Sequence, residues 1–305
     1  MLKSRDFLNL NVLRQVINDI RSLRIQGATN IAYAGLAAMR YVLNNTNAAS
    51  RESFFRKLLR ARDSLVNARP NEPMLRNALD YVIENLKSYE GDIRSQGIKL
   101  TEYLENRFNS SKKLMFRAGK RLIRKNSTVF THCHASSVMG IIKEAKPKIK
   151  EVYCTESRPR YQGRITAKEL VKAGIKTTMI VDSSVADYIK KADYFLIGCD
   201  VISSTYVINK IGSRMISILC DKYDVPLYVC SLSYKFDPES LTGLNEVVEE
   251  RSTKEVWDKP PRGLKIRNPA FDVVDFENIT GFITEYGVLP PDSFINMMRQ
   301  KKKIF

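Results

Sequence analysis

The residues best suited to chemistry are a cysteine and two histidines that are consecutive in the sequence. Cys133 lies between His132 and His134, and the chain has no other histidine. A thiolate is a nucleophile and a base, and histidine titrates near neutral pH. At this point Cys133 is either a reactive thiol or an inert buried cysteine at a strand end.

The pattern around Cys133 predicts a strand, a tight turn and the start of a helix. The apolar pair Val129–Phe130 is followed by small polar residues and then by apolar residues at helical spacing from Val138. Ser136 or Ser137 is the expected N-cap. The first N–H groups of such a helix have no intrahelical partners, so they predict a seat for a phosphate. The helix dipole also favours a thiolate at Cys133.

Other polar clusters follow the later predicted strands. Residues 155–164 hold three arginines, among them Arg158 and Arg160, which is typical of an anion-binding loop. Asp200 ends an apolar run, where burial would raise its pKa and suit it to acid chemistry, although it is also placed to cap a following helix. The last cluster comprises Asn209, Lys210 and Lys235, which either bind sugar hydroxyls and phosphates or are solvated.

These clusters require a parallel sheet to bring them together. From Leu122 onward apolar runs alternate with helical patterns, and we expect strands at residues 128–130, 152–154, 178–181, 195–197, 227–229 and 273–276. Parallel sheets bind ligands at the carboxyl ends of their strands. The Gly-x-Gly-x-x-Gly and Walker patterns are absent from the sequence, which disfavours a dinucleotide or Walker-type nucleotide site.

The N-terminal part of the chain is predicted to be helical. Apolar residues recur at three- and four-residue steps from Leu8 to about Gly119. Gly27 and Ala28 interrupt this pattern just before a helix, where they form either a plain turn or an anion site. Arg69, held out of the helix by the next proline, is either a phosphate-binding residue or a surface arginine. We therefore predict an all-helical domain over residues 1–119 and a Rossmann-like, mostly parallel α/β domain over 120–305.

Composition limits the class of protein. The 305 residues are 44% hydrophobic, enough for a packed core, and no apolar stretch is long enough to span a membrane. The N-terminus does not resemble a secretory signal, so we expect a cytoplasmic protein. Five cysteines without Cys-x-x-Cys spacing predict neither disulfides nor a metal site. The net charge of +17 is scattered, which disfavours a nucleic-acid partner, so the basic surface either attracts a phosphorylated substrate or only keeps the protein soluble.

Five segments carry a resemblance to a known family. They read Thr-His-Cys at 131–133, Thr-Glu-Ser-Arg-Pro-Arg-Tyr-Gln-Gly-Arg-Ile-Thr-Ala-Lys-Glu-Leu at 155–170, Val-Ile-Asn-Lys-Ile-Gly at 207–212, Tyr-Lys-Phe at 234–236 and Thr-Glu-Tyr-Gly-Val-Leu-Pro-Pro at 284–291. Together they resemble the archaeal ribose-1,5-bisphosphate isomerases, over about residues 24–298. These belong to a larger family with methylthioribose-1-phosphate isomerases and initiation factor 2B regulatory subunits.

The resemblance implies a reaction and a set of roles. It implies conversion of ribose 1,5-bisphosphate to ribulose 1,5-bisphosphate in nucleotide metabolism (AMP salvage), without a cofactor, by a homo-oligomer that is a dimer or hexamer. Cys133 would be the base that takes the C2 proton, and Asp200 the acid that assists ring opening. The residues implied around the substrate are Gln26, Gly27, Ala28, Arg69, Ala135, Ser136, Ser137, Asn209, Lys210 and Lys235, with the loop arginines Arg158 and Arg160 holding phosphate.

The chain departs from the family at a few positions. Gln26 stands where the family has arginine, and the segment from Asp200 to Asn209 is one residue shorter. His134 and Tyr286 replace an asparagine and an arginine. Two other functions therefore stay open, a non-catalytic regulatory subunit that binds a sugar phosphate or nucleotide, and a methylthioribose-1-phosphate isomerase.

Overall fold

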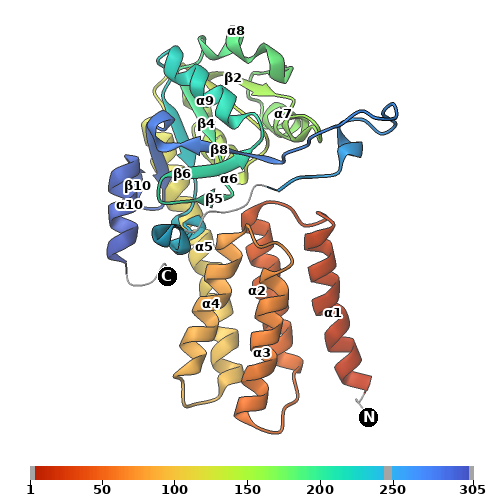
Figure 1. The fold of residues 1–305 in the computed structure, drawn as a ribbon. Coiled ribbons are helices and arrows are strands. Elements are labelled where there is room, and N and C mark those ends of the chain that lie inside the picture. Colours follow the sequence, from red (N-terminus) through yellow and green to blue (C-terminus); the bar gives the residue numbers. More distant parts are fainter. Residues whose placement is uncertain (1–3, 244–248, 302–305) are drawn as a thin grey trace. The chain divides into compact units, whose positions relative to one another are not determined.

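The structure, a computed structural model, describes residues 4–243 and 249–301, with side chains described from Val12 onward. It divides into two compact units (Figure 1). Of the described residues, the first unit comprises residues 4–110 together with Tyr234–Phe236, and the second comprises Ser111–Ser233 with residues 237–243 and 249–301. The division falls inside one long helix, which also contains the residue 119 at which the sequence analysis placed the domain boundary.

The first unit is helical, as the sequence predicted. Its helices are α1 (Ser4–Arg21), α2 (Ala28–Asn45), α3 (Arg51–Val66), α4 (Pro73–Lys87) and the first part of α5 (Ile93–Leu122). Apolar residues at three- and four-residue steps are fully buried, for example Leu36, Met39 and Leu43 on α2. Burial of such a stripe, more than intrinsic propensity, stabilises helices of this length.

The second unit contains a seven-stranded sheet with the order β10-β9-β7-β4-β1-β2-β3. Its strands are β1 (Ser127–Thr131), β2 (Ile149–Thr155), β3 (Thr177–Ile180), β4 (Tyr194–Ile197), β7 (Leu227–Cys230), β9 (Gly281–Thr284) and β10 (Gly287–Leu289). All neighbours pair in parallel except β9 with β10. The helices of this unit are α6 (Ser136–Glu144), α7 (Gln162–Lys172), α8 (Val185–Ile189), α9 (Ser213–Lys222) and α10 (Pro291–Gln300). The prediction of a mostly parallel sheet domain is therefore confirmed.

One predicted strand lies in a different sheet. β8 (Phe271–Asp275) was expected to extend the parallel sheet, but it pairs antiparallel with β6 (Tyr206–Lys210), which pairs in turn with β5 (Val201–Ile202). A short apolar run does not reveal its pairing direction, so the sequence could not separate the two sheets. Because Asp200 precedes a strand, the interpretation that it caps a helix is wrong.

The strand order places the ligand crevice. From β1 the chain moves through β2 and β3 toward one edge, and β4 then returns to the other side of β1. Ligands bind at such a switch point, outside the carboxyl ends of the two strands. Cys133 lies two residues beyond β1 and Asp200 three residues beyond β4. The topology alone therefore directs both residues to one crevice.

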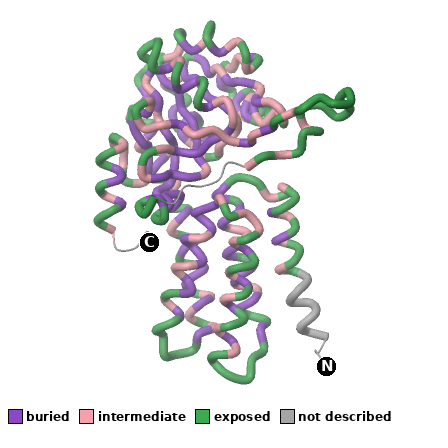
Figure 2. Tube along the Cα trace, in the orientation of Figure 1, coloured by how far each residue is buried: buried purple, intermediate pink, exposed green. Residues whose placement is uncertain are grey.

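The core of the second unit lies along the central strands. Phe130 on β1 and Phe195 on β4 are fully buried, with ring centroids 5.7 Å apart in an edge-to-face arrangement. Figure 2 shows the same burial along the strands and exposed loops around them. None of the described helices combines the length and the apolar composition needed to cross a membrane.

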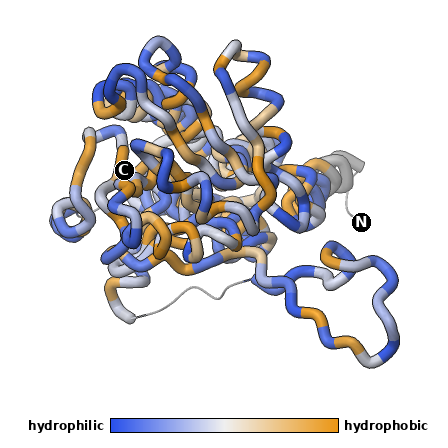
Figure 3. The backbone as a smooth tube through the Cα atoms, turned by 90° about the horizontal axis from the view of Figure 1, so that it is seen from above, coloured by the Kyte–Doolittle hydropathy of each residue, from blue (hydrophilic) through white to orange (hydrophobic). Residues whose placement is uncertain are grey.

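A long arm extends from the second unit, and we define it as residues 251–268. Most of its tip is exposed, and Figure 3 shows apolar stretches along an otherwise hydrophilic segment. Exposed apolar side chains on the arm include Val256 (39% exposed), Trp257 (51%) and Leu264 (48%). Its base is joined by an antiparallel bridge between Glu250 and Pro269.

Candidate active site

Cys133 occupies an unusual backbone conformation at the end of β1. Its φ is +65°, in the left-handed region that residues other than glycine seldom adopt. Its N–H donates to Ser157 Oγ at 2.8 Å, and its carbonyl accepts from Thr166 Oγ1 at 2.7 Å. The residue is partly exposed. Both of its peptide groups are thus fixed from α7 and the loop before it.

The protonation of Cys133 differs from expectation. Burial raises the pKa of its thiol to about 11, opposed by a hydrogen bond from the His134 N–H and by the charge of Lys210. Asp200 and Asp182 raise this pKa further. The thiol form prevails at neutral pH in the ligand-free chain. The prediction of a thiolate is wrong for this state, because the dipole of the short helix α6 does not offset the cost of desolvation.

Lys210 joins Cys133 and Asp200 at the switch point. It lies on β6 and is only 6% exposed, and burial lowers the pKa of its ammonium group. The charges of Cys133 and Asp200 both act on that pKa. The adjacent Asn209 is also buried and donates from Nδ2 to Ser213 Oγ at 2.9 Å. The structure therefore brings a thiol, a carboxylate and an amine into one electrostatic group.

The arginines of the predicted anion loop have partners within the protein. Arg158 donates to Tyr161 Oη at 2.7 Å and to the Val256 carbonyl at 3.2 Å, and Arg160 forms an ion pair with Glu255 at 3.1 Å. Glu255 also binds Arg251, and these contacts lower the pKa of Glu255 to about 2. A substrate phosphate would have to displace or share these contacts.

Asp182 fixes the start of that loop. Its two carboxylate oxygens accept from the N–H groups of Ser157 and Arg158, at 2.8 and 2.7 Å. Gly163 is needed at the other end of the loop, because a Cβ there would lie 1.7 Å from the Thr155 carbonyl oxygen. The loop is therefore held in one conformation beside Cys133.

The helix after Cys133 begins one residue earlier than a serine cap would allow. Ala135 is the N-cap of α6, so the prediction that Ser136 or Ser137 caps the helix is wrong. The first intrahelical bond runs from Met139 N–H to the Ala135 carbonyl at 2.9 Å. Alanine has no side-chain acceptor, and no side chain in the described part of the chain caps this helix. Its first N–H groups are thus suited to an oxyanion.

The first unit carries the remaining predicted residues. Gly27, with φ +81°, is the N-cap of α2, and Ala28 begins that helix as a buried residue. Gln26 is exposed and its Nε2 donates to the Leu23 carbonyl at 2.6 Å. Arg69 pairs with the buried Glu72 at 3.3 Å.

Lys235 also belongs to the first unit, although the sequence assigned it to the second. It is 8% exposed, in the turn Ser233–Lys235. The neighbouring backbone is held by Asn77 on α4, whose Nδ2 donates to the carbonyls of Tyr234 and Phe236 at 3.0 and 2.9 Å.

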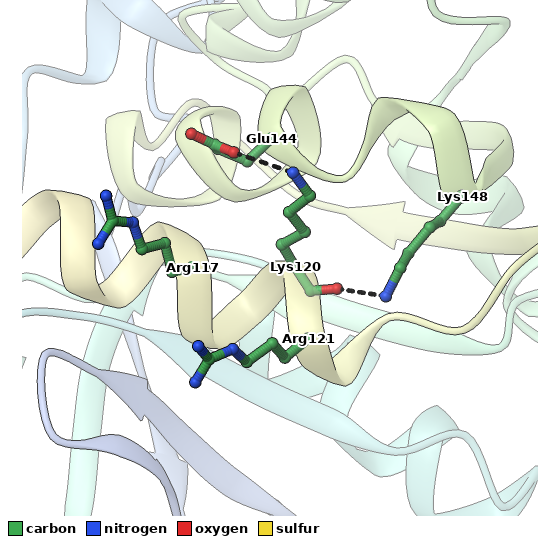
Figure 4. A pocket seen from close by; sticks show the side chains of 5 residues that line it. All are labelled: Arg117, Lys120, Arg121, Glu144 and Lys148. Atoms are coloured by element: carbon green, nitrogen blue, oxygen red, sulfur yellow. Dashed lines mark hydrogen bonds and ion pairs between the residues drawn. The ribbon is translucent and has the colours of Figure 1, made fainter.

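A separate pocket of about 480 Å³ lies at the end of α5 and has a structural explanation (Figure 4). It is lined by Arg117, Lys120, Arg121, Glu144 and Lys148. Lys148 Nζ donates to the carbonyls of Lys120 and Ile123 at 2.7 and 2.8 Å, and Lys120 pairs with Glu144 at 3.5 Å. Cations are favoured at a helix C-terminus, where they satisfy the last carbonyls. In the described residues, no group of three His, Cys, Asp or Glu side chains is arranged for a metal ion.

Comparison with known proteins decides the family. The model of the Initiation factor 2 subunit family matches residues 24–291. The chain belongs to this family. A ribose 1,5-bisphosphate isomerase from Archaeoglobus fulgidus is 37% identical over 279 residues, covering 90% of this chain and 88% of that protein. Further archaeal relatives carry the same name.

Members with other names are also similar. A methylthioribose-1-phosphate isomerase from Thermoanaerobacter is 34% identical over 323 residues, covering 98% of this chain and 93% of that protein. The crystal structure of translation initiation factor eIF-2B from Pyrococcus horikoshii superimposes with a TM-score of 0.79 at 26% identity, covering 95% of this chain and 98% of that one. The family therefore includes both enzymes and a translation factor, and the choice rests on the site.

Proposed function

We propose that the chain is an aldose–ketose isomerase that converts ribose 1,5-bisphosphate to ribulose 1,5-bisphosphate. The observation that carries this proposal is the convergence of Cys133, Asp200 and Lys210 at the switch point of the sheet. A thiol beside a carboxylate supplies the base and the acid that an aldose–ketose isomerisation requires, and a protein that only binds a ligand requires neither. The archaeal relatives named ribose 1,5-bisphosphate isomerase support the substrate.

The reaction requires an acid and a base on one sugar. A ribose phosphorylated on its anomeric oxygen keeps its ring closed until an acid protonates the ring oxygen, and we assign this step to Asp200. A base must then remove the proton from C2, and we assign this removal to Cys133. The thiol formed in this way returns the proton to C1, while the C2 hydroxyl gives its proton back to Asp200 as the ketone forms. Lys210 is suited to stabilise the negative charge that develops on the sugar oxygens.

The raised pKa of Cys133 sets a condition on this mechanism. The ligand-free chain holds a thiol, whose pKa of about 11 leaves little thiolate at neutral pH. Asp200 must carry a proton to act as an acid, and Cys133 must lose one to act as a base. One proton passing from the thiol to the carboxylate, directly or through the substrate, satisfies both requirements. Because that transfer removes the Asp200 charge, it also removes one of the charges that raise the Cys133 pKa.

The open helix N-termini are the proposed phosphate sites. Within the second unit, the uncapped start of α6, at Ala135, Ser136 and Ser137, would bind a phosphate, and Arg158 and Arg160 would add charge as their present partners exchange for phosphate. Within the first unit, the Gly27–Ala28 start of α2 is a candidate anion site of its own, and Arg69 and Lys235 are candidate cations for it.

An assay of the purified full-length chain tests the proposal. Ribose 1,5-bisphosphate is supplied, and ribulose 1,5-bisphosphate is followed by ³¹P NMR, with Asp200→Asn as the matched inactive variant. Formation of the ketose by the wild type and not by the variant is the expected result. If the wild type binds the bisphosphate in calorimetry without converting it, the non-catalytic regulatory function takes the place of the isomerase.

Methylthioribose-1-phosphate isomerase is the second candidate, and a specific observation favours it. Gln26 is neutral, and Arg69, Arg158 and Arg160 all have contacts with protein groups, so little free charge is offered to a second phosphate. Measuring kcat/KM for both sugars decides between them. If kcat/KM is higher for methylthioribose 1-phosphate than for ribose 1,5-bisphosphate, the methylthio sugar is the substrate.

We also propose that the chain forms a homo-oligomer. The exposed Val256, Trp257 and Leu264 of the arm supply apolar surface that a contact between copies would cover. Light scattering on the purified protein distinguishes a dimer from a hexamer, and a monomer would contradict this part of the proposal. The cytoplasmic location expected from the sequence stays a prediction.

A further inference from the structure

The two histidines beside Cys133 form hydrogen bonds to hydroxyl groups, and a backbone carbonyl at one end of each set of bonds determines which atoms donate. His132 is 2% exposed, and its Nε2 lies 2.8 Å from the Ile211 carbonyl. A carbonyl oxygen only accepts, so Nε2 carries the proton. Burial lowers the pKa of His132, so its Nδ1 is bare and accepts from Thr155 Oγ1 at 2.6 Å.

This chain of hydrogen bonds, which we call the first thread, continues to the backbone N–H of Cys133. Since the Thr155 hydroxyl donates to His132, its oxygen accepts from Ser157 Oγ, 3.1 Å away. Ser157 Oγ in turn accepts from the Cys133 N–H. Ser157 is itself left-handed, with φ +62°, and its own N–H is held by Asp182. The thread therefore joins the carbonyl of Ile211, after β6, to the backbone of Cys133, after β1.

A second thread reaches the carbonyl side of Cys133. The hydroxyl of Thr166 on α7 donates its hydrogen bond to the Cys133 carbonyl, so its oxygen accepts from His134 Nδ1 at 3.0 Å. His134 Nε2 faces Glu169 at 3.7 Å, and Glu169 is paired with Lys143. Each histidine thus supports one peptide group of Cys133 through hydroxyl groups. The ring nitrogens of both histidines contact Thr155, the Ile211 carbonyl, Thr166 and Glu169, and none of these contacts is to the thiol.

From these contacts we propose that His132 and His134 are positioning residues, which hold Cys133 in its left-handed conformation and do not exchange protons with the substrate. A left-handed residue other than glycine persists where its surroundings fix it. The gain is orientation, because the fixed Cys133–His134 peptide directs its N–H at the cysteine sulfur. The inference rests on the proposed function only for the reacting role of Cys133.

Hydroxyl deletions within the threads test this frame. Thr155→Val and Thr166→Val keep the side-chain shape and remove one link each, and Thr177→Val is the matched control, since it loses a Thr hydroxyl bond (2.9 Å, to the Ile175 carbonyl) in the same sheet. The first readout is the rate of Cys133 alkylation by iodoacetamide against pH, which needs no substrate. Both thread variants should shift the midpoint of that curve upward and slow alkylation at pH 9 about tenfold, whereas the control should match the wild type.

The second readout separates positioning from proton transfer. In each thread variant the fold decrease in kcat should exceed the fold increase in KM. His132→Gln keeps a donor for the Ile211 carbonyl, so it should retain at least about a tenth of the wild-type kcat and the same pH profile. Ser157→Ala serves if Thr155→Val fails to fold. Loss of the acid limb of the pH profile in His132→Gln, with normal alkylation, would make His132 an acid–base group and overturn the proposal. Unchanged alkylation in all thread variants would overturn it as well. A wild type without isomerase activity defeats the proposed function and leaves the alkylation test valid.

Discussion

The turns before α6 and α2 both contain a residue with a positive φ, but the two turns accommodate that conformation differently. Both helices start without a side-chain cap, at Ala135 and at Gly27, whereas α3 begins with Ser50 accepting from the Ser53 N–H at 3.1 Å. Each uncapped start leaves N–H groups for an anion. Before α6, the positive φ belongs to Cys133, which is held from both sides by hydroxyl groups. Before α2, the positive φ belongs to a glycine with open space around it.

The difference indicates which of the two turns must position its atoms precisely. A base must lie within a fraction of an ångström of the proton that it removes, so its backbone is over-determined. A phosphate can be bound by mobile donors, so the Gly27 turn needs only freedom of conformation and access. If this interpretation is right, changes at Cys133 should affect kcat and changes near Gly27 should affect binding.

The largest expected effect comes from Cys133→Ser. A hydroxyl of similar shape is a far poorer base near neutral pH, so kcat should fall on the order of 10² to 10⁴-fold with KM nearly unchanged. Steady-state kinetics checks this, with the buried Cys220→Ala as a control for general damage. Retained activity would remove Cys133 from the mechanism.

Asp200→Asn should come next, with a loss of kcat of about 10²-fold or more, because the amide cannot deliver a proton to the ring oxygen. Asp200 precedes β5 and caps no helix, so the variant should fold with a melting temperature close to that of the wild type. An unfolded variant would show that the carboxylate has a structural role.

The pH dependence of kcat/KM tests the state of the base. The free enzyme holds Cys133 as a thiol with a pKa of about 11, and the thiolate fraction grows tenfold per unit below that value. In the proposed mechanism the proton of Cys133 passes to Asp200, so the resting and the reactive forms carry the same number of protons. We therefore expect kcat/KM to be level through neutral pH and to fall as the pH approaches about 11, where Cys133 loses that proton to the solvent. A rise of about tenfold per pH unit through neutral pH would contradict the transfer to Asp200.

How far the sequence predicts this molecule depends on the range of the interactions. The helices, the parallel strands and the approach of Cys133 to Asp200 follow from periodicity and from the position of residues after strands. The pairing of β8 with β6 does not, because it depends on a long-range choice between two sheets. The thiol form of Cys133 was not predicted either. The sequence shows the nine residues of α6, whose dipole favours a thiolate, but it does not show the burial of the thiol, which depends on the whole fold.

The contacts of the arginines and histidines were missed for a similar reason. Three arginines in ten residues predicted an anion-binding loop and gave no sign that Arg160 pairs with Glu255, which is distant in sequence. The roles of Thr155 and Thr166 had no signal beyond their places after a strand and on a helix. In hindsight, a serine and threonines in the segment that follows a strand of a parallel sheet are candidates for such framing.

Gln26→Arg should sharpen the comparison by adding charge to the open turn. A charge-assisted bond to phosphate is about twice as strong as a neutral one, so the variant should bind ribose 1,5-bisphosphate more tightly by about 1 to 3 kcal/mol, with kcat little changed. In the ligand-free chain Gln26 bonds the Leu23 carbonyl, which an arginine can also do. Isothermal titration against mono- and bisphosphorylated sugars measures the change. Weaker binding of the bisphosphate would indicate that the turn serves another ligand.

The smallest expected effect, and the most specific, concerns Gly27→Ala. Gly27 and Gly243 have φ values of +81° and +85°, and an added Cβ would meet nothing within 4 Å at either position. Alanine should therefore cost both turns the same backbone strain, about 1 kcal/mol in the free energy of unfolding. Urea denaturation should confirm equal costs. Only Gly27→Ala should also raise KM several-fold, since its methyl group narrows the approach to the first N–H groups of α2. If Gly243→Ala raises KM equally, the effect is one of stability and the Gly27 turn is a plain connection between α1 and α2.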